Sequence, residues 1–200
     1  MPLKFANNQS LTSTTALPSA VPTDNLILIS TQTASNSSSV SFTSGLDSTY
    51  DMYEFKFINV VPTVDENGFE FQGSTNGGST YGVTMTSTFF QAYHTESDST
   101  TALNYSTGDD LAQSTGFQIL LTGVGNGADE SCVASMSLFN PSSTTYVKHF
   151  ISSGNIYDAS DFSVNYFVAG YGNTTSAVNA IQFKMSSGNF DGTIAMFGVL

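Results

Sequence analysis

From Leu26 onward, apolar and polar residues alternate with a period of two over short segments. The clearest segment is "YDMYEFKFINV" (50–60), in which Tyr53, Phe55 and Phe57 share one face and the intervening residues share the other. Successive side chains of a β-strand point to opposite faces, so this spacing is typical of a strand. We expect Tyr53, Phe55 and Phe57 to lie in a core and the other face to be mixed.

The same period recurs along the chain between turn signals rich in Gly, Asn, Asp and Ser. Further predicted strands are "NLILIST", "SVSFTS", "FEFQGS", "YGVTMTSTFFQAY", "GFQILLTGV", "CVASMSLF", "TYVKHFIS", "FSVNYFVAG", "VNAIQFKM" and "TIAMFGV". Short strands at this spacing, with no helix of ordinary length, predict an all-β fold, an antiparallel β-sandwich or barrel. No repeat of fixed period is present, which disfavours a propeller or a solenoid.

Residues 1–25 differ from this pattern. "MPLKFANNQSLTSTTALPSAVPTDN" carries three of the five prolines, and its polar tract has neither a helical nor a strand period. We therefore predict an extended N-terminal arm over 1–25 and one β-sandwich domain over 26–200. Such an arm becomes ordered only by lying on its own domain or on a neighbour.

The last residues, "SSGNFDGTIAMFGVL", predict a turn followed by a final strand. Ile194 and Met196 fall on one face of that strand and Phe197 on the other, so both faces are apolar. This pattern favours a strand covered on both sides, inside the sandwich or against a neighbouring subunit.

Charge restricts the classes of partner. The formal net charge is −12, and the four basic residues are all lysines. Nucleic acids and anionic membranes are bound through clustered Lys and Arg, so we expect neither as a partner.

No apolar run approaches the length of a membrane span, and the opening residues lack the pattern of a secretion signal, so we expect synthesis in a reducing cytoplasm. The single cysteine, Cys132, excludes an internal disulfide and is expected to be a small buried residue.

Candidate catalytic and metal-binding residues are sparse. His94 and His149 stand in no metal-ligand spacing, and no nucleophile elbow is present. Acidic residues cluster in Gly/Asn-rich turns; a glycosidase pair or a calcium loop in "GVGNGADE" or "STGDD" is therefore less favoured than solvated turns. The Gly123, Gly125 and Gly127 spacing precedes no helix pattern, which argues against a dinucleotide site. We predict no enzyme, no cofactor and no metal.

Several segments together resemble structural proteins of tailed-bacteriophage virions. They are "MPLKFANN", "FTSGLDSTYDMYEFKFINVVP", "GGSTY", "FNPSS" and "SGNFDGTIAMFGV", and they span most of the domain. Proteins that look like this include capsid decoration or cement proteins with jelly-roll folds, commonly trimeric, and modules of fibres or tails. The resemblance implies no catalytic residues.

The resemblance implies a capsid decoration protein on the virion surface, with the major capsid protein and copies of itself, as a homotrimer, as partners. Under this hypothesis the arm is the contact element, with Leu3, Phe5, Leu11 and Leu17 as apolar anchors, and Phe197 is a further contact residue. The alternative is a tail, fibre or head-fibre component that binds host-surface glycan. A glycan-cleaving enzyme is a third hypothesis.

Overall fold

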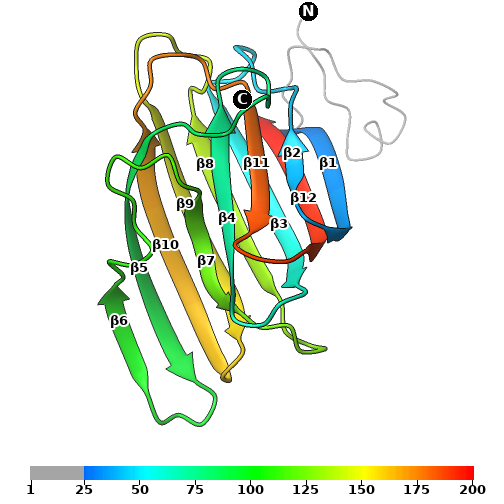
Figure 1. The fold of residues 1–200 in the computed structure, drawn as a ribbon, viewed down its shortest axis with the longest axis vertical. Coiled ribbons are helices and arrows are strands. Elements are labelled where there is room, and N and C mark those ends of the chain that lie inside the picture. Colours follow the sequence, from blue (N-terminus) through cyan, green and yellow to red (C-terminus); the bar gives the residue numbers. More distant parts are fainter. Residues whose placement is uncertain (1–24) are drawn as a thin grey trace, which may run out of the picture.

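The computed structural model describes residues 25–200, which form antiparallel β-strands joined by turns and loops (Figure 1). The strands are β1 (Leu26–Ser37), β2 (Val40–Phe42), β3 (Met52–Pro62), β4 (Asn67–Ser74), β5 (Met85–Thr95), β6 (Thr101–Tyr105), β7 (Gln118–Val124), β8 (Cys132–Phe139), β9 (Lys148–Asp158), β10 (Phe162–Gly172), β11 (Ala180–Met185) and β12 (Phe190–Val199). The predicted all-β antiparallel fold is confirmed.

The strands form two layers. A large sheet has the order β1-β12-β3-β8-β9-β10-β5-β6, and a small sheet, β7-β4-β11-β2, packs on it (Figure 1). The layers are joined where Val124 of β7 pairs with Asp158 of β9, so the whole sheet is nearly a closed barrel. Pairing is antiparallel throughout, which suits a fold with one buried and one outward face on each sheet.

The core between the sheets is aromatic. Phe183 of β11 lies at its centre, with ring centroids 4.9 Å from Phe57, 5.2 Å from Phe55 and 6.0 Å from Phe69. All four side chains are buried, and edge-to-face pairs add to the stabilisation from burial. The aromatic residues that alternate along β3 and β4 therefore meet across the interior.

Strand β3 confirms the predicted alternation. Tyr53, Phe55 and Phe57 are buried, and the alternation shifts by one residue at Asn59, which has a φ of 49°. The pairing of β3 with β8 is irregular at the same place, as expected for a β-bulge. Because of the bulge, the side chain of Val60 points into the core although it follows Phe57 by three residues.

The C-terminal strand β12 lies between β1 and β3, so it is an interior strand of the large sheet. Ile194 and Met196 are fully buried in the core. The amide of Leu200 donates to the carbonyl of Asn25 at 3.1 Å, which fixes the end of the strand beside the start of β1.

Three features differ from the sequence prediction. β6, "TALNY", is a strand that the pattern does not predict, β1 continues to Ser37, beyond the predicted segment "NLILIST", and β9 continues to Asp158, beyond the predicted segment "TYVKHFIS". Cys132 is buried in β8, as expected.

Candidate interaction surface

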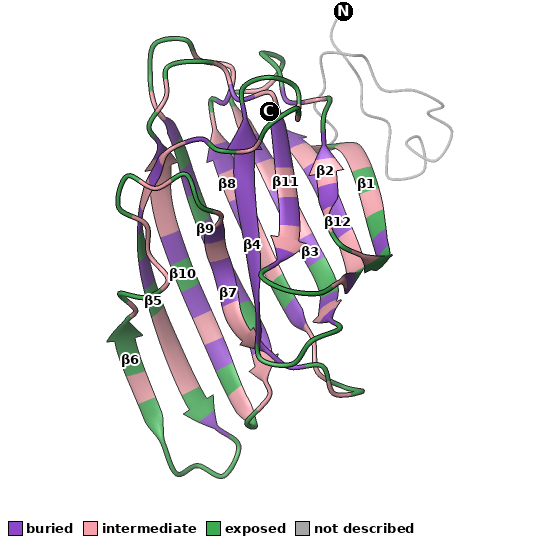
Figure 2. Ribbon diagram, in the orientation of Figure 1, coloured by how far each residue is buried: buried purple, intermediate pink, exposed green. Residues whose placement is uncertain are grey.

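The outward side of the large sheet has almost no charge, and we call it the open face. In its eight strands the residues between the buried ones point outward, an alternation visible along β10 in Figure 2. Apart from Asp191, the only carboxylate and lysine side chains on this face of the described strands are Glu54 and Lys56, which form an ion pair with each other. The histidines His94 and His149 also occupy outward positions. Asp191, at the start of β12, stands at its rim. A chain of net charge −12 thus has a nearly neutral face.

One corner of the open face is apolar. Along β1, β12, β3 and β8 the pairing places Leu26, Val199, Met52 and Phe139 in one row across the strands. Leu28 and Phe197 are paired in the next row, and Leu28 is 58% exposed. We call these six residues the corner patch. Contiguous exposed apolar side chains on a soluble protein mark surfaces that contact other molecules.

A second apolar group lies at the opposite edge, on β10, β5 and β6. Phe90 and Phe167 are paired and stacked, with ring centroids 5.1 Å apart and planes at 14°. Tyr105 is paired with Phe90, and Leu103, two residues earlier, is 72% exposed. The hydroxyl of Tyr105 donates to Asp110 Oδ2 at 2.5 Å, and this bond raises the pKa of Tyr105.

The predicted contact residues fall in two places. Phe197 lies in the corner patch between Leu28 and Glu54, where its side chain is half-buried; the described residues leave this face of β12 outside the sandwich core. Leu3, Phe5, Leu11 and Leu17 lie outside the described residues. The described chain starts at Asn25, next to Leu26, so the predicted arm is covalently attached at the corner patch.

The outward side of the small sheet is polar and covered. Gln72 of β4 is fully buried there, and its amide donates to the carbonyls of Thr115 and Gly116 at 3.1 and 2.7 Å. These bonds hold the segment between β6 and β7 over the sheet. Lys184 pairs with Glu70 at 2.9 Å. This face therefore has less surface to offer a partner than the open face.

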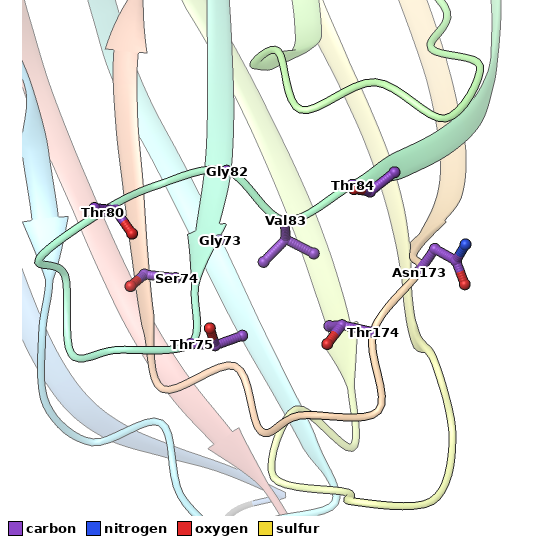
Figure 3. Close-up of a pocket in the computed structure, with 9 residues that line it drawn as sticks. All are labelled: Gly73, Ser74, Thr75, Thr80, Gly82, Val83, Thr84, Asn173 and Thr174. Atoms are coloured by element: carbon purple, nitrogen blue, oxygen red, sulfur yellow. The ribbon is translucent and has the colours of Figure 1, made fainter.

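A pocket of about 240 Å³ lies where β4 ends, beside the chain that leads into β5 and the turn after β10 (Figure 3). Its side-chain polar groups are hydroxyls and one amide, from Ser74, Thr75, Thr80, Thr84, Asn173 and Thr174. None of these groups titrates near neutral pH, so the pocket supplies no acid or base for catalysis.

The two histidines and the buried lysine of the described chain make separate contacts. His94 contacts Asp98 at 3.0 Å, and His149 lies edge-on to the ring of Tyr171. Lys148 is buried and donates to two main-chain carbonyls, and desolvation lowers its pKa. Within residues 25–200 no group of three His, Cys, Asp or Glu side chains is placed to hold a metal ion.

Sequence reasoning missed most of the open face. The two-residue alternation along a strand does predict which single residues point outward: Phe167 falls between the core positions Tyr166 and Val168. The pairing that stacks Phe167 on Phe90 is long-range and carries no local signal.

No helix in residues 25–200 has the length and apolar character needed to cross a membrane. Comparisons of the chain with protein-family models, with curated proteins and with solved structures gave no match.

Proposed function

We propose that this protein is a structural protein of a bacteriophage virion that decorates the head, binding the shell between capsomers of the major capsid protein. The observation that carries the proposal is the open face, a broad, nearly neutral surface with an apolar corner on a strongly acidic chain. Such a face can approach a large partner without desolvating many charges, and interface cores are depleted in charged residues.

The corner patch and the arm act together in this proposal. The arm is attached at Asn25, directly beside Leu26, so a partner that contacts Phe197 and Leu28 is within reach of the arm anchors Leu3 and Phe5. Two linked contacts raise the effective concentration of the second one. A homotrimer would multiply these contacts, because each particle site would hold three arms and three corners.

The resemblance to virion structural proteins supports the same function. Its most extensive segment, "FTSGLDSTYDMYEFKFINVVP", includes β3, and its C-terminal segment, "SGNFDGTIAMFGV", includes β12. These two strands pair with each other and form the centre of the corner patch. The segments that resemble virion proteins are therefore also those that build the proposed contact.

The test is to add the purified protein back to virions that lack it and to measure occupancy by quantitative mass spectrometry. Deletion of residues 2–20 and Phe197→Asp are expected to abolish occupancy while circular dichroism shows the β fold retained. Ser176→Asp, which adds the same charge in an exposed loop away from the open face, should bind like wild type. Wild-type occupancy by both the deletion and Phe197→Asp would contradict the proposal, as would absence of the protein from purified virions.

A second candidate is a tail, fibre or head-fibre component that binds host-surface glycan. The observation that favours it is a cleft beside β7, lined by aromatic and hydrogen-bonding side chains. Copy number separates the two candidates: a decoration protein is present at a number comparable with the major capsid protein, and a tail component at a small fraction of it.

A further inference from the structure

The cleft lies where the large sheet extends past the small one. Its floor is the inward side of β5 and β10, its wall is the end of β7, and the turn after β9 closes one end. Its volume is about 380 Å³, within the range of roughly 300 to 1,000 Å³ typical of small-ligand sites. We infer that this cleft binds an uncharged sugar unit of a glycan.

The floor supplies aromatic rings. Tyr93 of β5 and Phe162 of β10 are both half-buried, and their rings pack edge to face with centroids 5.5 Å apart. The hydroxyl of Tyr166 donates to the carbonyl of Thr122 at 2.7 Å, which ties the floor to the β7 wall. A sugar ring has an apolar C–H face, and the electron-rich face of an aromatic ring attracts such hydrogens.

The floor and the closed end also supply hydrogen-bonding groups with free capacity. The side-chain amide of Gln91 makes no hydrogen bond within residues 25–200, and it lines the cleft from β5. Asp158 Oδ1 accepts from the amide of Ser160 at 2.9 Å. Its Oδ2 lies beside Gly123, where a Cβ would stand 2.5 Å away, so the glycine leaves room for this carboxylate. Sugar hydroxyls both donate and accept hydrogen bonds, so they can bond to the Gln91 amide and to the Asp158 carboxylate.

The charge of the cleft selects against anionic ligands. Glu66 and Asp158 line it, and the carboxylates of Glu130 and Asp65 are close enough to add to the effect of burial in raising the pKa of Asp158. The three lysines of the described chain contact groups elsewhere: Lys56 contacts Glu54, Lys184 contacts Glu70, and Lys148 contacts main-chain carbonyls. A carboxylated or sulfated sugar would thus meet repulsion without compensation.

This inference goes beyond head decoration, because it does not depend on where in the virion the protein sits. The cleft residues Gln91 and Asp158 are not part of the corner patch, so the two functions can be separated by substitution. A decoration protein with such a cleft would attach particles to glycans on or near a host. The glycan test uses the isolated full-length chain, and the particle test uses virions.

The experiment is saturation-transfer NMR of the full-length protein with neutral gluco-, galacto- and N-acetylglucosamine oligosaccharides, and with a sialylated oligosaccharide as the anionic probe. At least one neutral sugar should receive saturation. Asp158→Asn and Gln91→Ala should each weaken its binding about tenfold or more, since each change removes or weakens a hydrogen bond between the protein and the sugar. Phe167→Ala, which removes an aromatic ring from the open face, should bind like wild type.

Thermal melts of each variant separate lost binding from lost folding, and both polar substitutions are expected to melt as wild type does or slightly higher. The inference is overturned if no neutral sugar receives saturation, if Asp158→Asn and Gln91→Ala bind as wild type does, or if the sialylated probe binds as well as the neutral ones. The double variant Gln91→Ala with Asp158→Asn should still occupy virions, which distinguishes failure of the cleft from failure of the decoration function.

Discussion

The two outward faces of the sandwich are opposites. Each face carries one lysine–glutamate pair, but the open face of the large sheet exposes apolar side chains, whereas the outward side of the small sheet is covered by the segment between β6 and β7. The same strand alternation produces both faces, so secondary structure does not explain the difference. An apolar face that is not covered is the one available to a partner.

The largest effect should come from the core that both faces enclose. Phe183→Ala removes the ring at the centre of the aromatic cluster and should lower the free energy of unfolding by about 3 to 5 kcal/mol. The matched variant Phe167→Ala, on the open face and 40% exposed, should cost much less. Urea denaturation followed by circular dichroism measures both. Equal losses would show that the open face is packed like a core.

The cover over the small sheet gives the next effect. Gln72→Leu leaves the carbonyls of Thr115 and Gly116 without their donors and should cost about 1 to 3 kcal/mol. Hydrogen exchange should become faster in the segment between β6 and β7. Gln182→Leu is the control, because Gln182 is paired with Gln72 on the same face but bonds to Ser41 instead. An unchanged exchange rate in Gln72→Leu would mean that other contacts hold the cover.

On the open face itself the effect should be small. Leu28→Asp adds a charge at an exposed position and should change stability by at most about 0.5 kcal/mol. Sedimentation and denaturation of the isolated protein provide the measurement. A loss of stability several times larger than this would show that another part of the chain, or a second copy, covers the corner patch in solution.

The smallest effect concerns pH. Burial, with the charges of Glu130 and Asp65, raises the pKa of Asp158 above its ordinary value of 3.8, so the folded state binds this proton more tightly than the unfolded state does. The stabilisation from this group is present below the unfolded pKa and is lost as pH rises through the folded pKa. The melting temperature of Asp158→Asn relative to that of wild type should therefore increase as the pH rises from acidic to neutral. Thermal melts of both proteins across this interval measure the difference, which would stay constant if the pKa of Asp158 were the same in the folded and unfolded states.

The sequence predicted strands well where one face is buried. "CVASMSLF" coincides with β8, and Tyr53, Phe55 and Phe57 lie in the core as expected. β6 escaped prediction because it is a short edge strand whose residues are mostly exposed, so alternation has little apolar content to reveal.

The second half of β9 was missed for a different reason. "SSGN" has the composition of a turn, but Gly154 is buried against β8, where a Cβ would stand 2.5 Å from that of Ala134. Close packing between strands, which local composition does not encode, decides the conformation there. The same limit applies to the candidate surface: Phe197 was predicted from its own strand, whereas its proximity to Leu28 depends on pairing across the chain.

The buried thiol of Cys132 gives this molecule a built-in reporter. The residue is the sole cysteine, it lies in β8 beside β3, and burial raises its pKa, so a thiol reagent can react only when this part of the sheet opens. The labelling rate of the wild-type chain thus measures how often the start of β8 separates from its neighbours β3 and β9. Comparing the labelling rate of the free protein with that of the particle-bound protein would show whether binding through the open face slows local opening of these strands.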